Sequence, residues 1–523
     1  MAISGGWGVP PGPEIHKSKW GLPEWAFKTS SALERSSSWA TRLDVEAKDA
    51  VLVRRDALGI SPVFVRSFDW GWAVAADLPV LLRLGSIPDA EPCALREYVF
   101  YDGWIGGPLP FANTFMVPAD ELWRLDLCSR IPVCEGRWTG GILTQPRSHL
   151  SPAAQKEEVA TAIREALSGL SGEGPLGLFM SGGLDSTLLA ALACEGDVPV
   201  TAFTCAVGED KFDESVSASA IARHLNLELI QVQLDRRSFL AGLVDAIVNS
   251  GLPVGFPNHV GLALVAKVAG RAGVRLMLTG EGADELFGGY PRLIELRDRL
   301  REAPSEPKTR SVSGSDLERE IFLLRGLDDL ARIGFGFPER LALASRLRML
   351  LSEENDPLER ELRIAWMTEF FQTLPLTLLR LHAASRYGSV QVAFPYLGRR
   401  VIQAGVASLP RLSTLERTKP VVRDLSAGRL PPQVLELPKS GFDIPLELWL
   451  PPLDEILGSG FEVVFGLSRE PALSWARYAP ASRDLRWATL NIEIWSRLFV
   501  LGHSVDAVKD WVTCFVYRKE EMQ

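Results

Sequence analysis

A glycine-rich turn that carries hydroxyl groups lies between an apolar stretch and a helical stretch, at Ser181-Gly182-Gly183-Leu184-Asp185-Ser186. Glycine permits positive φ and close backbone approach, so the N–H groups of such a turn can point at an anion at the helix N-terminus. Ser181 and Ser186 add donors. Asp185 would repel a phosphate unless a divalent cation lay between them, so the pattern predicts a phosphate site that includes Mg2+.

This turn differs from the two common nucleotide loops, since it lacks both Gly-Lys-Ser/Thr and Gly-x-Gly-x-x-Gly. It resembles the Ser-Gly-Gly-x-Asp-Ser loop of the N-type ATP pyrophosphatases. Those enzymes cleave ATP between the α and β phosphates and use the AMP half to activate a carbonyl or carboxylate. The alternative is a glycine turn ahead of an ordinary helix.

A second loop, Gly280-Glu281-Gly282-Ala283-Asp284-Glu285, supplies three carboxylates between glycines. Asp284, in the first turn of the next helix, is expected to complete a metal shell with Asp185, because Mg2+ takes one or two protein carboxylates and fills its other positions with phosphate oxygens and water. Glu281 then remains for proton transfer, provided that burial raises its pKa toward the working pH. The alternative is a solvated acidic turn.

Length and composition exclude several classes of protein. A chain of 523 residues predicts two or three domains, and 46% hydrophobic with 23% charged residues is typical of a globular protein. A net charge of −9 argues against nucleic acid or an anionic membrane as a partner. The six cysteines form no Cys-x-x-Cys pair and indicate buried thiols in a reducing cytoplasm. The six histidines lack i, i+4 spacing, which argues against zinc.

The order of elements predicts an α/β fold. Short β signals occupy about 40–145, and a plausible linker covers 136–151. From there, helices and strands alternate, which predicts a doubly wound parallel sheet whose ligands sit beyond the carboxyl ends of the strands. The predicted elements are helix 154–170, strand 175–180, a helix from 184, strand 200–207, helix 214–226, strand 228–234, helix 259–272 and strand 275–279. Residues 303–316 are expected to form a polar surface loop.

Five motifs together resemble the synthetase domain of glutamine-dependent asparagine synthetase and its relatives, β-lactam synthetase and lasso-peptide cyclases. Besides the two loops, they are Val392–Leu397, Lys419–Arg423 with Leu430-Pro-Pro, and Pro438–Pro445. The resemblance covers about 151–455. It implies an adenine-nucleotide α-hydrolase-like synthetase domain over 151–523 and a smaller, glutaminase-like β-rich domain over 1–150.

By this resemblance, a carboxylate attacks the α-phosphorus of ATP, pyrophosphate leaves, and an amine displaces AMP to form an amide. Lys439 is similar to the family lysine that meets pyrophosphate and the oxyanion of the tetrahedral intermediate, and Glu281 is expected to deprotonate or orient the amine. Lys419 and Arg423 are weaker candidates for phosphate contact, with surface salt bridges as the alternative. The implied ligands are Ser181, Gly182, Gly183, Asp185, Ser186 and Gly280 for ATP and its pyrophosphate, Phe203 and Thr204, just past the second strand, for adenine, and Asp185 with Asp284 for Mg2+.

Two departures from the family pattern bear on the substrates. Position 2 is alanine, where glutamine-dependent enzymes need a cysteine, and no cysteine precedes Cys93. This predicts a degenerate N-terminal domain without glutaminase activity. In the substrate region, acidic family positions are replaced in His382–Arg386 and at Gly398, so aspartate is not expected to be activated. His382 is interpreted as an ordinary helix residue, in preference to the alternative that it is catalytic. Aromatic residues of this region are interpreted as core or as an apolar pocket: Trp366, Phe370, Phe371, Tyr387 and Tyr396.

The favoured hypothesis is a cytoplasmic, ATP- and Mg2+-dependent amide synthetase of specialised metabolism, such as antibiotic biosynthesis, acting on a small-molecule or peptide carboxylate and amine. Alternatives are β-lactam closure and lasso-peptide macrocyclisation, the latter with a precursor peptide and a partner protein. Ammonia-dependent asparagine synthesis and a tRNA-modifying pyrophosphatase or sulfur transferase are further alternatives, as is a non-catalytic homologue. The oligomeric state is left open.

Overall fold

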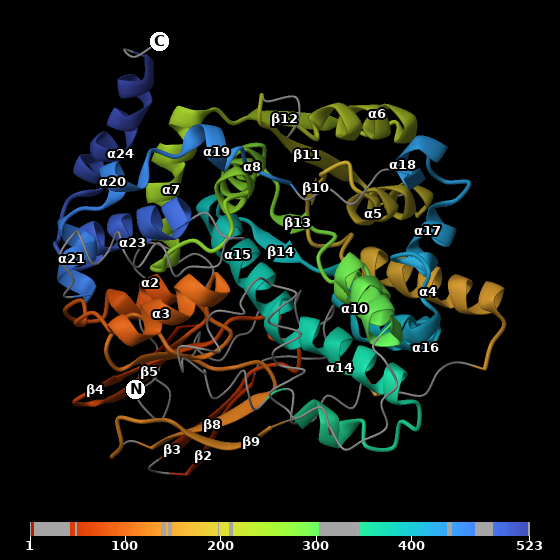
Figure 1. The fold of residues 1–523 in the computed structure, drawn as a ribbon, viewed down its shortest axis with the longest axis horizontal. Coiled ribbons are helices and arrows are strands. Elements are labelled where there is room, and N and C mark those ends of the chain that lie inside the picture. The colour runs from red at the N-terminus through yellow and green to blue at the C-terminus, as the bar shows by residue number, and fades with distance from the viewer. Residues whose placement is uncertain are drawn as a thin grey trace.

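Five parallel strands form the sheet that carries both glycine-rich loops (Figure 1). The computed structural model describes residues 2–4, 42–47, 50–126, 128–137, 143–144, 149–196, 198–208, 213–302, 343, 346–436, 442–465 and 485–520. The strands are β10 (Leu176–Phe179), β11 (Val200–Ala206), β12 (Leu229–Gln233), β13 (Leu276–Leu278) and β14 (Gln391–Ala393). Each predicted strand of this region lies within two residues of its expected bounds. The α/β class is therefore confirmed.

The spatial order of the strands is β12-β11-β10-β13-β14, with every neighbouring pair parallel. From β10 the chain first adds strands on one side and later returns to add β13 and β14 on the other. The order therefore reverses between β10 and β13, and ligands of such sheets bind at this kind of reversal. Both candidate loops directly follow these two strands.

Helices cover both faces of the sheet, as a doubly wound arrangement requires. In Figure 1, α7, α8 and α15 lie to the left of the sheet and α4, α5 and α6 to its right. The bounds are α4 (Pro152–Ser168), α5 (Leu184–Glu195), α6 (Ser215–Leu225), α7 (Arg236–Ser250), α8 (His259–Arg271), α9 (Ala283–Phe287), α10 (Pro291–Glu302), α14 (Pro357–Gln372) and α15 (Leu374–Tyr387).

After β14, the described elements of the chain are all helices. They comprise η2 (Pro395–Leu397), α16 (Arg399–Ser408), η3 (Leu412–Thr414), α17 (Pro420–Ser426), α18 (Pro432–Glu436), α19 (Leu446–Trp449), α20 (Leu453–Ile456), α21 (Ser459–Phe465), α23 (Leu485–Phe499) and α24 (Val505–Glu520). Within the ranges given above, no helix combines the length and the apolar character needed to cross a membrane.

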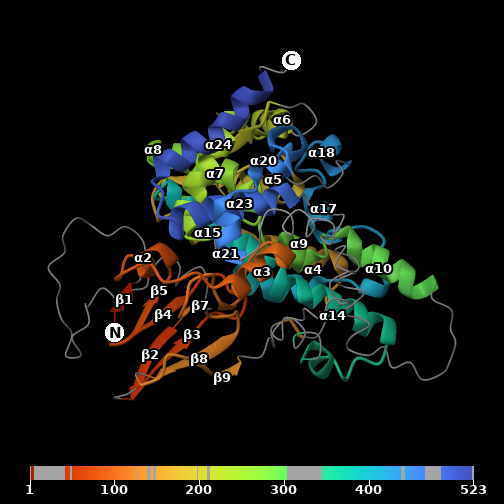
Figure 2. The same cartoon turned by 60° about the vertical axis from the view of Figure 1, so that its left-hand side comes forward.

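Two further sheets form the N-terminal β region, at the lower left of Figure 2. One has the order β1-β5-β4-β7-β6 and the other β2-β3-β8-β9. Alternate residues of the two sheets face each other around Val53, Val65 and Trp72, which are fully buried. The bounds are β1 (Ala2–Ser4), β2 (Arg42–Ala47), β3 (Ala50–Arg54), β4 (Phe64–Phe68), β5 (Gly71–Ala75), β6 (Gly107–Pro108), β7 (Thr114–Met116), β8 (Glu121–Asp126) and β9 (Val133–Arg137), with helices α2 (Leu78–Leu82) and α3 (Pro92–Tyr101).

The core between these two sheets is separate, but the other face of the β1-β5-β4-β7-β6 sheet, with Phe64 and Ala73, packs with α2 and α3 into the core of the rest of the chain. Tyr98 on α3 donates its hydroxyl hydrogen to Val254 O at 2.8 Å, and Arg386 on α15 forms an ion pair with Asp77. The predicted β-rich N-terminal region is thus present. Its likeness to a glutaminase and the boundary between 1–150 and 151–523 stay predictions.

Some expectations for single residues are corrected by the structure. Cys128, Cys134 and Cys514 are exposed, so the prediction of buried thiols is wrong for these three, while Cys205 is buried. Trp366, Phe370 and Tyr396 are core residues rather than the lining of an apolar pocket. The expected surface loop over 303–316 and most of the expected linker lie outside the described residues.

His382 is buried on α15, where its Nε2–H donates to Ile60 O of the N-terminal β region at 2.5 Å. Burial lowers the pKa of His382 to about 4, against the smaller opposing effect of this hydrogen bond. Below about pH 6.5, His382 gains a proton in the unfolded chain but stays neutral in the folded protein. The contribution of the neutral His382 to the free energy of unfolding is therefore fully present at neutral pH and is lost as the pH falls toward 4.

We expect His382→Gln to reduce this pH dependence. Between pH 7.5 and pH 5, the free energy of unfolding of the variant should fall by about 2 kcal/mol less than that of the wild type, measured by urea denaturation. His503→Gln, at an exposed histidine, is the control and should behave as the wild type. If the free energy of unfolding of His382→Gln falls with pH as steeply as that of the wild type, the lowered pKa of His382 is contradicted.

Candidate active site

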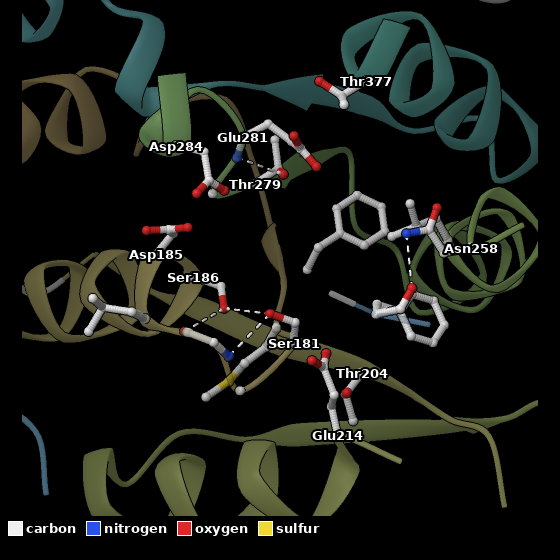
Figure 3. A pocket seen from close by; sticks show the side chains of 18 of the residues that line it. Ser181, Asp185, Ser186, Thr204, Glu214, Asn258, Thr279, Glu281, Asp284 and Thr377 are labelled. Carbon is white, nitrogen blue, oxygen red and sulfur yellow. Dashed lines mark hydrogen bonds between the residues drawn. The ribbon is translucent and has the colours of Figure 1, made fainter. Parts of the chain in front are cut away.

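The first loop connects β10 to α5 through Met180–Gly183. Gly182 adopts φ +78°, which favours glycine, and turns the backbone so that α5 begins at Leu184. Ser181 Oγ accepts a hydrogen bond from Gly183 N at 3.2 Å and lies 3.3 Å from Ser186 Oγ (Figure 3). The first N–H groups of a helix have no partner within the helix, so this end of α5 can bind an anion.

The second loop, Thr279–Gly282, connects β13 to α9 and lies directly against the first. A Cβ at Gly280 would come within 3.0 Å of both Asp185 Cβ and Ser186 N. Asp284 stands in the first turn of α9, as predicted. Figure 3 shows Asp185 and Asp284 pointing toward one another across the space between the loops.

Lys419, which precedes α17, joins the two aspartates. Its Nζ lies 2.8 Å from Asp284 Oδ1 and forms a second, closer ion pair with Asp185. The Lys419 side chain is only 8% exposed, so the alternative of a surface salt bridge is wrong for this residue. Burial alone would lower the pKa of Lys419, but the two carboxylates outweigh it and raise this pKa above its usual value.

Gly289 leaves the space that this arrangement needs. A Cβ at position 289 would lie 2.0 Å from Asp284 Oδ1 and 2.3 Å from Lys419 Cε. Any larger residue would therefore displace the aspartate, the lysine or both. This close approach explains the glycine at position 289.

The donor set fits a divalent cation. Two carboxylates from different loops converge on one position, which the Lys419 ammonium occupies as a stand-in positive charge. Mg2+ commonly takes one or two protein carboxylates and keeps its other positions for phosphate and water. Asp185 and Asp284 are the residues that would hold it.

We expect Lys419→Met to destabilise the protein by about 3 kcal/mol, because it leaves two partly buried carboxylates facing each other without a cation. Adding Mg2+ without nucleotide should restore part of this loss, measured as a shift in the thermal unfolding midpoint. Lys509→Met, which breaks a lysine pair with the single carboxylate of Asp245, is the matched control and should gain nothing from Mg2+. A Lys419→Met protein indifferent to Mg2+ would contradict a cation site here.

A cavity of about 360 Å³ opens between the two loops, α8 and α15. It is large enough for a small-molecule ligand. Twelve of the thirteen predicted site residues line it: Ser181, Gly182, Gly183, Asp185, Ser186, Phe203, Thr204, Gly280, Glu281, Asp284, Lys419 and Arg423. The thirteenth, Lys439, lies outside the described residues, so its expected role stays a prediction.

Two of these residues are placed differently from the expectation. Phe203 and Thr204 lie within β11, not beyond it, although both still line the cavity. Arg423 donates through Nε to Thr418 O at 3.0 Å and through a second nitrogen to Leu435 O. Its guanidinium therefore braces the backbone around α17 and α18, and the surface salt bridge proposed as its alternative is wrong.

Glu281 lies at the other end of the cavity and is not unpaired. Its Oε1 accepts from Arg380 of α15 at 2.5 Å, and its side chain is 27% exposed. In Figure 3 it points away from Asp284, toward the half of the cavity where Thr377 and Asn258 lie. The sequence did not indicate Arg380, because an arginine in an amphipathic helix carries no local sign of its partner.

The charges that line the described part of the cavity do not favour an anion by themselves. Four carboxylates stand against three cations, namely Asp185, Glu214, Glu281 and Asp284 against Arg380, Lys419 and Arg423. A triphosphate here would depend on backbone N–H groups, the α5 N-terminus and an added cation. This reasoning from charge supports the predicted need for Mg2+.

Fold and site together are typical of α/β proteins that bind a nucleotide where the strand order of a parallel sheet reverses. The family model described as asparagine synthase matches residues 158–463, more than half of the chain. The protein therefore belongs to the asparagine synthase family.

Similar curated proteins support this membership. The chain is 26% identical over 429 residues to a putative glutamine-hydrolysing asparagine synthetase of Mycobacterium tuberculosis, an alignment that covers 76% of this chain and 65% of the relative. Asparagine synthetase 1 of Bacillus subtilis, named as glutamine-hydrolysing, is 26% identical over 56% of this chain and 50% of its own length. Amidase chyE of Penicillium rubens is 28% identical over 26% of this chain and 24% of its own length. The chain thus spans just under two thirds of the mycobacterial relative.

Proposed function

We propose that this protein is an ATP-dependent synthetase that adenylates an organic carboxylate and transfers the acyl group to an amine, releasing pyrophosphate and AMP. One observation carries the proposal. Asp185 and Asp284, from loops far apart in the sequence, share one buried ammonium at the reversal of the sheet. That arrangement suits a polyphosphate chain held together with its cation.

In the first step, a carboxylate oxygen of the substrate attacks the α-phosphorus of ATP, and the bond between the α-phosphorus and the bridging oxygen breaks. Pyrophosphate leaves with that oxygen and the electron pair. The loop residues Ser181 to Ser186 bind the departing phosphates through backbone N–H and hydroxyl groups. Mg2+, when bound by Asp185 and Asp284, neutralises phosphate charge. Lys439 is proposed to meet the pyrophosphate.

In the second step, the amine nitrogen attacks the acyl carbon, the C–O bond to AMP breaks, and one proton leaves the nitrogen. Glu281 is proposed to orient the amine and accept that proton. Its side chain lies at the cavity wall, away from the two aspartates, so the acid and amine would meet between the phosphate loop and Glu281.

The finer parts of the proposal concern the substrates. An acid other than aspartate, as in specialised metabolism, is proposed from the sequence, since acidic family positions are replaced at His382 and Gly398. Neither residue lines the described part of the candidate active-site cavity, so both would act on the choice of acid only indirectly. The matched amidase of Penicillium rubens shows that relatives carry names other than asparagine synthetase. Glutamine is not the proposed nitrogen source, since position 2 is alanine.

The test is product analysis with purified protein, ATP, Mg2+ and a panel of acetate, hexanoate, benzoate, aspartate and glutamate, with ammonium or methylamine as nucleophile. The proposal predicts acid-dependent release of pyrophosphate and AMP. Formation of ADP and orthophosphate would contradict adenylation. Production of glutamate from added glutamine would contradict the absence of glutaminase activity.

A further inference from the structure

Arg380 occupies the wall between the candidate active-site cavity and a smaller cavity of about 60 Å³ behind it. Its side chain is only 9% exposed. One terminal nitrogen donates to Glu281 Oε1 at 2.5 Å and the other to Asn258 Oδ1 at 3.0 Å. The guanidinium also lies 5.2 Å from the ring centre of Phe256. The planar fork of arginine is thus fixed in one orientation.

Asn258 continues the chain of contacts in the other direction. Its Nδ2 donates to Phe442 O at 3.0 Å, the dashed line drawn from Asn258 in Figure 3. Its Oδ1 accepts from Arg380. Because both ends of the amide are engaged, its orientation is defined. The ring of Phe442 packs tightly on α8, where a Cβ at Gly261 would lie 2.6 Å from it. Phe442 follows Lys439 by three positions in the sequence.

These contacts form a continuous path from Phe442 through Asn258 and Arg380 to the carboxylate of Glu281. The residues on the other side of Arg380 do not weaken its interaction with Glu281. His259, whose ring lines the smaller cavity, is neutral because burial lowers its pKa to about 3, so it does not repel the guanidinium. The lining of that cavity is otherwise largely apolar and includes Trp104 and Leu376, and its other charged residues are Asp102 and Arg386.

We propose that Asn258 and Arg380 are positioning residues that hold Glu281 for amine transfer and tie its position to that of Phe442. This inference rests on the proposed function for its kinetic consequence, but not for its structural one. Breaking the path at either residue should leave adenylation in place and reduce the fraction of adenylate that becomes amide. A residue needed only for folding would lower both steps together.

The kinetic test measures amide formed per pyrophosphate released, using the acid and amine panel named above. We expect Arg380→Met and Asn258→Ala each to lower this ratio about tenfold or more, with pyrophosphate release within about threefold of the wild type. Arg380→Lys should restore part of the ratio, because an ammonium can pair with Glu281 without reproducing the fork to Asn258. The double variant should be no worse than the single variants, since either break interrupts the same path.

Arg386→Met is the matched control. It removes a partly buried arginine of the same helix from its ion pair with Asp77. Arg386 lines the smaller cavity, as Arg380 does, but not the active-site cavity. The substitution should lower thermal stability without changing the ratio. An unchanged ratio in Arg380→Met, or an equal fall in Arg386→Met, would overturn the proposal.

Hydrogen exchange tests the path without any substrate. We expect Arg380→Met and Asn258→Ala each to speed amide exchange in both 279–285 and 442–448, whereas Arg386→Met should affect neither segment. Faster exchange in only the nearer segment of each variant would overturn the coupling. If the wild type releases no pyrophosphate with any acid, the proposed function fails, and the exchange result still decides whether the path exists.

Discussion

Asp185→Asn is expected to reduce acid-dependent pyrophosphate release by at least about a hundredfold. The substitution keeps the size of the side chain but removes one of the two charges that face Lys419. It would leave the cation position with Asp284 alone and the α5 N-terminus without its acidic partner. The measurement is a coupled pyrophosphate assay at saturating ATP and Mg2+, with thermal unfolding recorded in parallel.

Asp424→Asn is the control for this substitution. Asp424 lies on α17 and pairs with Arg417 at the surface, where its side chain is 53% exposed. Its loss should leave pyrophosphate release unchanged, since exposed ion pairs contribute little. An Asp185→Asn protein that keeps a tenth or more of the wild-type rate would remove Asp185 from the proposed role.

Glu281→Gln is expected to separate the two steps of the reaction. Pyrophosphate release should persist, while amide formation falls by about a hundredfold to ten-thousandfold, the usual range for loss of a positioned general base. The adenylate would then be lost to water, so AMP and free acid should accumulate. The measurement is the simultaneous rate of pyrophosphate, AMP and amide production.

The ion pair with Arg380 complicates this variant, because glutamine leaves a largely buried arginine without its charge partner. Glu281→Asp keeps the charge and shortens the side chain by one methylene, so it should give an intermediate amide rate. Glu295→Gln, at an exposed position of α10, should match the wild type. Amide formation in Glu281→Gln at the wild-type rate would rule out its assigned role.

The sequence predicted those parts of the fold that have a local signal. Strands such as β10 and β11 are short apolar runs bounded by glycine or polar residues, and α4 begins at a serine followed by proline. β14 was not predicted, because Gln391–Ala393 has no periodicity of its own and becomes a strand by pairing with β13. The exposure of Cys128 and Cys134 likewise depends on how the β8–β9 hairpin is packed.

The candidate site was predictable where a loop supplies the residue and not where a distant helix does. Asp185 and Asp284 follow two strands of one sheet, so their approach was expected from the strand order of α/β folds. The position of Lys419 between them depends on how α17 packs on α9, and Gly289 gives only an indirect sign of it. The ion pair of Arg380 with Glu281 depends on how α15 lies against the sheet, which no local pattern reports.

The central claim, that the carboxylate attacks the α-phosphorus of ATP, is tested most directly by isotopic labelling of the carboxylate oxygens. An acid that supports pyrophosphate release is labelled with 18O in its carboxylate, and the products are analysed by mass spectrometry. If the carboxylate attacks the α-phosphorus, one labelled oxygen is carried into AMP when the amine displaces it. Label in orthophosphate, with ADP as the nucleotide product, would contradict the account.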